Sequence, residues 1–174
     1  MAILPSGITR TQLAVLMEQY GPAFFILEEQ VFRQNLRDLR NAFEHEYSPM
    51  EIGYSFKTNY TPRICKLALE EGVKAEVVSE LEYELALRIG FSPDQIIFNG
   101  PLKPKDILWR ALSDGATVHV DSFREIELIE EYLRGRGARP VTCSVRCNFS
   151  LESQSETRFG IDIETADIED AFDR

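Results

Sequence analysis

A single lysine ends a predicted strand that has one nearly empty face. In the strand predicted over residues 51–56, alternate side chains share a face, and the large ones all fall on the same side. The opposite side carries Gly53, Ser55 and, at the carboxyl end, Lys57. One interpretation is a lysine aimed into a cavity sized for a flat cofactor. The other is a surface lysine whose stem lies along the protein with its charge in water.

Polar side chains recur where the other predicted strands end. Glu76 lies in the apolar run 75–78, where a carboxylate is costly unless it has a partner. Each later strand also ends on polar residues, namely Asn99, Asp121 with Ser122, and Arg146 with Asn148. Taken singly, these are ordinary turn or cap residues. Their recurrence over five strands favours a ligand site, because parallel α/β folds bind ligands at that rim.

Strands and helices alternate regularly from residue 51 onward. Strands are predicted over 51–56, 75–78, 96–98, 117–120 and 141–145, and helices over 62–71, 81–89, 104–112 and 123–134. This alternation indicates βαβ units with right-handed crossovers and a parallel sheet. An open doubly wound sheet and a (β/α)8 barrel both fit. A complete barrel needs roughly 250 residues, so this chain of 174 residues would hold only part of one, about the first five βα units.

The two ends of the chain are less regular. Thr9 is placed to cap a helix that runs through Gln19, and the apolar run 23–27 reads as a short strand. Residues 28–46 have apolar side chains at helical spacing. Near the carboxyl end, 148–157 is predicted to be a loop and 165–172 the start of a helix. We expect residues 1–19 to form a helical lead-in and residues 20–174 an incomplete barrel domain.

The composition narrows the function classes. The chain has 19 Lys and Arg against 29 Asp and Glu, a formal net charge of −10, which argues against a binder of the nucleic-acid backbone. No apolar run approaches the ~18 residues of a membrane span, and the start lacks a secretory pattern. Three cysteines are too few for a disulfide scaffold and suit a reduced, cytoplasmic chain. We therefore expect neither a nucleic-acid nor a membrane partner.

Motifs for other chemistries are weak or missing. Cys143 and Cys147 are four residues apart, and His45 and His119 are far apart in sequence, so we expect no zinc site and no other metal site. Neither glycine-rich phosphate motif, GxGxxG or GxxxxGK[ST], occurs in the sequence, and the nucleophile motif GxSxG is also missing.

Several segments, in order along the chain, resemble one enzyme group: the pyridoxal-phosphate decarboxylases of the alanine-racemase-like fold type. This group includes the diaminopimelate, ornithine and arginine decarboxylases, and the first of these resembles the chain most. The central match is Tyr54-Ser-Phe-Lys-Thr-Asn59, which is similar to the group's Tyr-Ala-x-Lys-Ala-Asn segment. The other matching segments are 20–27, 75–79 with 82 and 85–90, 96–103, 120–125, 145–148 and 157–161.

The resemblance implies a cofactor and roles for three residues. Lys57 would hold pyridoxal 5'-phosphate as a Schiff base, and exchange with the substrate amine would then free the lysine. The cofactor ring would act as an electron sink as carbon dioxide leaves. Glu76 and Arg146 match residues that line the cofactor near the lysine, and we expect them to orient it and to neutralise each other. The implied activity is decarboxylation of a diaminopimelate-like or other basic or diamino acid.

The resemblance also implies that much of the active site is not in this sequence. Members of the group continue beyond this point with a ring-stacking histidine, a glycine-rich phosphate turn, a glutamate at the pyridine nitrogen and a C-terminal β domain. Within the matched part, Thr58 replaces a usual alanine and Phe149 stands where a proline is common. Neither substitution removes a side chain to which the resemblance assigns a role in the reaction.

Three functions remain open at this point. The chain could be the N-terminal part of a decarboxylase, inactive in isolation, that works as a homodimer in the full-length form or with a complementing C-terminal chain. It could be a non-catalytic remnant that acts by association through its exposed sheet edges. It could also belong to an amino-acid racemase of the same fold type, which would need a second acid/base group on the other face of the ring.

Overall fold

The computed structural model describes residues 7–136, 140–150 and 158–174, and its centre is a five-stranded parallel sheet. The strands pair in chain order, as β1 (Gly53–Ser55), β2 (Lys74–Val77), β3 (Ile96–Phe98), β4 (Thr117–Val120) and β5 (Cys143–Val145). The predicted alternation and the parallel sheet are therefore confirmed. The first and last strands are shorter than predicted.

A helix follows each of the first four strands. These helices are α3 (Pro62–Glu70), α4 (Glu80–Ile89), α5 (Lys105–Asp114) and α6 (Phe123–Arg136), with a short 3-10 turn, η1 (Pro93–Gln95), before β3. Pro62 occupies the first turn of α3, where its missing N–H costs nothing. Gly90 and Gly115 end α4 and α5 in the left-handed conformation that glycine adopts most easily. These helix ends agree with the sequence, whereas the helix predicted over 123–134 continues through Gly135 to Arg136.

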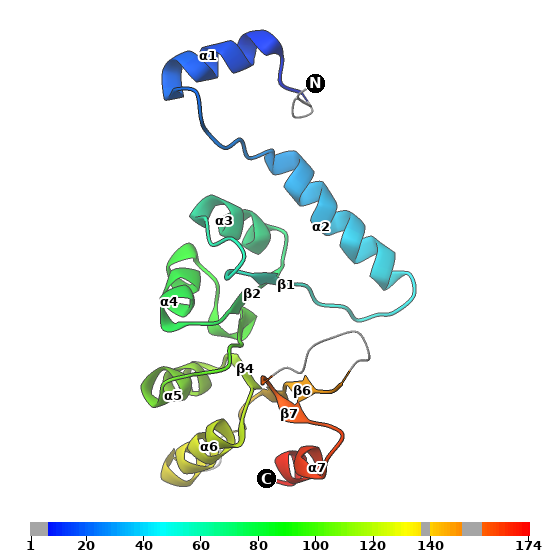
Figure 1. Cartoon of the computed structure of the whole chain (residues 1–174), viewed down its shortest axis with the longest axis vertical. Helices are drawn as coiled ribbons and strands as arrows, with labels where there is room; N and C mark the ends of the chain where they lie inside the picture. The colour runs from blue at the N-terminus through cyan, green and yellow to red at the C-terminus, as the bar shows by residue number, and fades with distance from the viewer. Residues whose placement is uncertain (1–6, 137–139, 151–157) are drawn as a thin grey trace.

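The core lies between the sheet and these helices, which are stacked along one side of the strands (Figure 1). On β2, β3 and β4 the helix-facing residues are buried and apolar: Ala75, Val77, Ile96, Phe98, Val118 and Val120. The residues between them are less buried. The sheet therefore has one face closed by helices and one face that no helix among the described residues covers.

One prediction for the N-terminal part, the strand at 23–27, is wrong. Helix α1 (Arg10–Tyr20) is capped by Thr9, whose side chain accepts a hydrogen bond from the Gln12 backbone N–H, and α2 (Glu29–Glu44) follows the predicted amphipathic pattern. The run 23–27 forms no strand, however, and Phe25 is fully exposed. A strand needs a neighbouring edge for its backbone hydrogen bonds, and the structure gives this run none.

Beyond the sheet, the chain adds a second, smaller pairing. Strand β6 (Cys147–Asn148) pairs with β7 (Ile161–Asp162) in parallel, and α7 (Asp167–Asp173) follows. In Figure 1, α7 lies beside α6, and Arg174 Nε, at the end of α7, donates to Glu130 Oε1 of α6 at 2.9 Å. The predicted helix at 165–172 is therefore present. Of the predicted loop at 148–157, Asn148 belongs to β6, and residues 151–157 lie outside the described residues.

Helix α2 is attached to the end of α3 by arginines that converge on one carboxylate. Arg33 and Arg37 both donate to the side chain of Glu71, at N–O distances of 2.8 Å, and Arg40 donates to the Glu71 backbone carbonyl at 2.7 Å. Hydrogen bonds from Arg37 and then Arg33 lower the pKa of the Glu71 carboxyl to about 2. The charged form of Glu71 therefore stabilises the docking of α2.

This attachment predicts a specific acid sensitivity. A carboxyl group whose pKa is depressed by folding adds stability above its unfolded pKa, here about 4.5, and loses it as pH falls towards about 2. We expect Glu71→Gln to lower the free energy of unfolding at pH 7 and the deficit to shrink between about pH 4.5 and pH 2. Urea titrations of both proteins at several pH values between about 2 and 7 measure this difference in the free energy of unfolding. Glu18→Gln, on the exposed α1, is the control, and a deficit independent of pH would contradict the prediction.

Candidate functional site

The open face of the sheet carries a row of polar side chains on β1, β2, β4 and β5, interrupted by Ile97 on β3. Register pairs Ser55 of β1 with Glu76 of β2, and His119 of β4 with Ser144 of β5. Paired residues in neighbouring strands point to the same side, and alternation places these four opposite the buried apolar set. The row approaches the carboxyl ends of the strands, which is where sites form in parallel α/β folds.

Lys57 lies in the turn directly after β1, and its side chain is exposed. The turn is fixed on both sides of the lysine, because the Phe56 N–H donates to the Glu76 carbonyl at 2.9 Å and the Thr58 N–H to the Ser55 carbonyl at 3.2 Å. Gly53, earlier on the same strand, has no side chain to fill the open face. The amine therefore projects from a constrained turn beside the end of β2.

Glu76 has a partner on the next strand, as its position in an apolar run requires. The Asn99 side-chain amide donates to Glu76 Oε1 at 2.9 Å. The other end of the same amide, Asn99 Oδ1, is buried and has no hydrogen-bond partner among the described residues. A buried acceptor without a donor is unfavourable, so this oxygen is suited to receive a hydrogen bond from a bound molecule.

Arg146 is placed differently from our expectation. Its Nη1 lies 2.9 Å from Asp121 Oδ1, and the Asp121 carboxylate is only 5% exposed. The predicted mutual neutralisation of Glu76 and Arg146 is therefore wrong. The reason is topological, since Arg146 follows β5 and Asp121 follows the adjacent β4, whereas Glu76 lies on β2 with two strands between. The Arg146 guanidinium also lies 5.0 Å from the centre of the Phe159 ring.

His119 is a second titratable group on the open face. Burial lowers the pKa of its imidazole, and the nearby Glu76 carboxylate opposes that shift. The neutral imidazole is therefore favoured at neutral pH, where it can donate or accept a hydrogen bond. In the sequence, His119 alternates with Val118 and Val120, on the same strand that ends on the polar residues Asp121 and Ser122.

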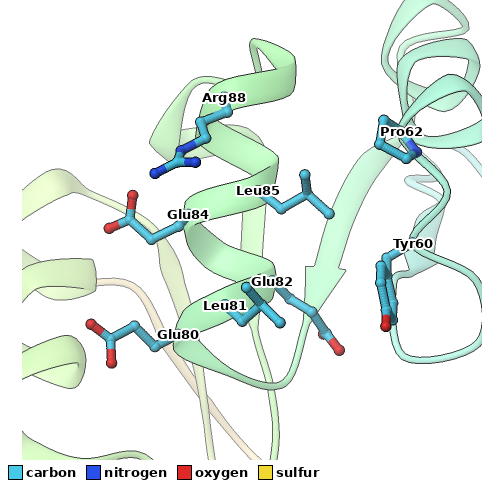
Figure 2. Close-up of a pocket in the computed structure, with 8 residues that line it drawn as sticks. All are labelled: Tyr60, Pro62, Glu80, Leu81, Glu82, Glu84, Leu85 and Arg88. Carbon is cyan, nitrogen blue, oxygen red and sulfur yellow. The ribbon is translucent and has the colours of Figure 1, made fainter.

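A groove in the described structure lies beside this row and not on it. Its volume is about 620 Å3, and in Figure 2 Tyr60 and Pro62, from the segment after β1, face Leu81 and Leu85 of α4. Lys57, Glu76 and Arg146 do not line it. A smaller hollow of about 420 Å3 includes Asp121 and Arg158. The candidate site is therefore identified by its polar row and not by the volume of a cavity.

The described residues contain neither a candidate membrane span nor a candidate metal-binding cluster. No described helix is both long and apolar enough to cross a membrane. Within the same residues, no three His, Cys, Asp or Glu side chains are grouped as they would be around a metal ion.

Comparison with known proteins identifies the family. Residues 32–172 match the family model described as pyridoxal-dependent decarboxylase, pyridoxal binding domain. The chain is 34% identical over 129 residues to diaminopimelate decarboxylase of Methanothermobacter thermautotrophicus, covering 74% of this chain and 29% of that protein. It is 29% identical over 172 residues to diaminopimelate decarboxylase of Staphylococcus aureus, covering 93% and 40% respectively.

Solved structures show the same fold. Diaminopimelate decarboxylase from M. jannaschii in complex with L-lysine superimposes with a TM-score of 0.80 at 24% identity, over 92% of this chain and 40% of that one. Lysine/ornithine decarboxylase from Vibrio vulnificus in complex with putrescine gives a TM-score of 0.63 at 25% identity, over 77% and 38%. The predicted partial (β/α)8 barrel is therefore confirmed.

The chain thus spans between 29% and 40% of the length of these relatives. Its four βα units with a fifth strand, the polar row near the carboxyl ends of the strands and the family match over residues 32–172 all describe the same part of the barrel. The chain belongs to the pyridoxal-dependent decarboxylase family, whose cofactor is pyridoxal phosphate, and it carries the N-terminal part of that family's barrel.

Proposed function

We propose that this chain supplies the lysine-bearing part of an amino-acid decarboxylase, with pyridoxal phosphate held by Lys57. The observation that carries the proposal is the position of Lys57 at the carboxyl edge of the open sheet face, in a turn fixed by hydrogen bonds to the Ser55 and Glu76 backbone carbonyls. Residues 1–19 are proposed to be a lead-in to this domain, which begins at about residue 20.

The residues on the open face fit such a cofactor. Lys57 offers a primary amine for covalent attachment, and the small Gly53 and Ser55 leave space on the same face. Asn99 Oδ1 is a buried acceptor with no hydrogen-bond partner among the described residues, and the amide nitrogen of the same side chain donates to Glu76. We assign Glu76 to orienting the cofactor and Arg146 to supplying positive charge towards it. When bound, the pyridoxal ring supplies an acceptor for the electron pair left by the departing carboxylate.

The proposed substrate is a diamino or basic amino acid. Support comes from the names of the relatives, which are diaminopimelate decarboxylases, and from solved neighbours bound to L-lysine and putrescine. Turnover is expected to require the C-terminal part of the enzyme, from the same gene product or from a complementing chain. The full-length form is proposed to be a homodimer.

Complementation tests this function. The 174-residue chain is mixed with pyridoxal phosphate and meso-diaminopimelate, lysine or ornithine, with and without the separately expressed C-terminal part of a diaminopimelate decarboxylase. We expect carbon dioxide release only in the mixture that contains both parts and one of these amino acids. No cofactor-dependent absorbance and no release in any mixture would overturn the proposal.

A second candidate function, association without turnover, is favoured by one observation. Within the five-stranded sheet, β1 pairs only with β2 and β5 only with β4, so one edge of each outer strand lacks a strand partner in the described structure. Unpaired edges are sites at which another chain can add a strand. Sedimentation of the chain with and without the C-terminal part distinguishes the cases, because association without catalysis gives a complex that releases no carbon dioxide.

A further inference from the structure

A buried ion pair joins the loops at the carboxyl ends of β3 and β4. Lys103 lies between β3 and α5, and its side chain is fully buried, while the Glu125 side chain in the first turn of α6 is 4% exposed. The Lys103 Nζ donates to Glu125 Oε2 at 3.0 Å and to Oε1 at 3.1 Å. None of the roles assigned above uses this pair.

The two side chains also bind the backbone around the end of β4. Lys103 Nζ donates to the Gly100 carbonyl and to the His119 carbonyl, each at 2.7 Å. Glu125 Oε2 accepts from the Asp121 N–H at 2.9 Å, and Oε1 accepts from the Lys103 N–H at 3.2 Å. His119 and Asp121 flank the last residue of β4, so the pair holds the backbone on both sides of that strand end.

Stability alone is a weak explanation for such a pair. Removing two charges from water is costly, and well-packed apolar residues often replace buried ion pairs without loss of stability. The contacts point instead to placement, because the backbone they hold carries Asp121. The Asp121 carboxylate in turn accepts from Arg146 Nη1 at 2.9 Å. A continuous set of hydrogen bonds therefore runs from the buried pair to Arg146.

We propose that Lys103 and Glu125 are positioning residues for cofactor binding, which act by fixing Asp121 so that its carboxylate holds Arg146. The proposal rests on the role assigned to Arg146 under the proposed function. It predicts that loss of the buried pair frees the Arg146 guanidinium first and weakens cofactor binding through that residue. Asp121→Asn should have the same effect while leaving Lys103 and Glu125 in place.

The first test needs no cofactor. Arginine side-chain NMR relaxation reports the order of the Arg146 guanidinium in the 174-residue chain. We expect that order to fall in Glu125→Gln and in Asp121→Asn. The matched control is Glu131→Gln, which removes an exposed Lys–Glu pair between α5 and α6, Lys105 with Glu131, and should leave Arg146 unchanged. Unchanged order of Arg146 in Asp121→Asn would overturn the proposal even if Glu125→Gln failed to fold.

The second test measures coupling to the cofactor. We expect Glu125→Gln to weaken pyridoxal phosphate binding about tenfold in the otherwise unchanged chain and less than about twofold when Arg146→Met is already present. An equal loss in both backgrounds means that the pair supports only the fold, and it overturns the proposal. If the unchanged chain captures no cofactor, the proposed function fails, and the NMR result alone decides whether the pair positions Arg146.

Discussion

Replacing Lys57 with alanine is expected to abolish covalent capture of pyridoxal phosphate by this chain. The ε-amino group condenses with the cofactor aldehyde, water leaves, and borohydride reduction makes the carbon–nitrogen bond permanent. In the unchanged chain, peptide mass spectrometry should find the added phosphopyridoxyl group on the peptide that contains Lys57. In Lys57→Ala the labelling should fall to background, and carbon dioxide release by the complemented enzyme should fall more than about 100-fold.

Two further variants test whether capture depends on the primary amine of Lys57, and not on its charge or on an unrelated lysine. Lys57→Arg keeps a positive charge but has no primary amine, so it should fail as completely as alanine. Lys105→Ala removes an exposed lysine that is paired with Glu131 on the helix side, and it should leave labelling of Lys57 intact. Because Lys57 is exposed in a turn, circular dichroism should show that both Lys57 variants fold. Labelling of Lys57→Ala at the level of the unchanged chain would contradict the assignment.

The sequence predicted the sheet and the helices that cover it because their signals are local. The apolar runs, Pro62 at the start of α3, and Gly90 and Gly115 at the ends of α4 and α5 each fix a boundary without information from elsewhere in the chain. The failed strand at 23–27 shows the limit of this approach. An apolar run has the right residues for a strand, but only a free neighbouring edge makes it one.

The site was predictable in its location but not in its pairing. Polar residues at successive strand ends indicated the carboxyl rim, and the structure places Lys57 and Arg146 there, with Glu76 just before the rim on β2. Which acid binds Arg146 depends on strand order, and strand order places Asp121 beside it and leaves two strands between it and Glu76. Only the three-dimensional arrangement could correct that expectation.

The sequence contains a partial signal for the buried pair of Lys103 and Glu125. Ser122 and Glu125 have the spacing of a capping box, in which the glutamate folds back to a backbone N–H at the start of a helix. In the structure Glu125 does fold back, but it accepts from Asp121 N–H, one residue earlier, and it also binds Lys103. A local pattern could not predict this partner, because Lys103 is 22 residues away and fully buried.

Gly160→Ala is expected to separate β7 from β6 and to disturb Arg146. Gly160 has φ +86°, and a Cβ there would lie 2.6 Å from the Arg146 carbonyl oxygen and 3.2 Å from its carbonyl carbon. The same oxygen accepts from the Ile161 N–H at 2.7 Å, so the clash falls on a hydrogen bond that links the two strands. Because the obstacle is backbone, it cannot be relieved by a side-chain rotation.

Gly115→Ala is the matched control for this clash. Gly115 has φ +93°, but a Cβ there meets nothing within 4 Å, so alanine incurs only the left-handed backbone penalty of about 1–2 kcal/mol. We expect Gly160→Ala to lower the free energy of unfolding by more than this, measured in urea, and to remove hydrogen-exchange protection from the Ile161 amide. It should also weaken capture of pyridoxal phosphate at Lys57, whereas Gly115→Ala should not. Equal losses of stability and unchanged capture in the two variants would show that the contact between Gly160 and Arg146 is not what places the arginine.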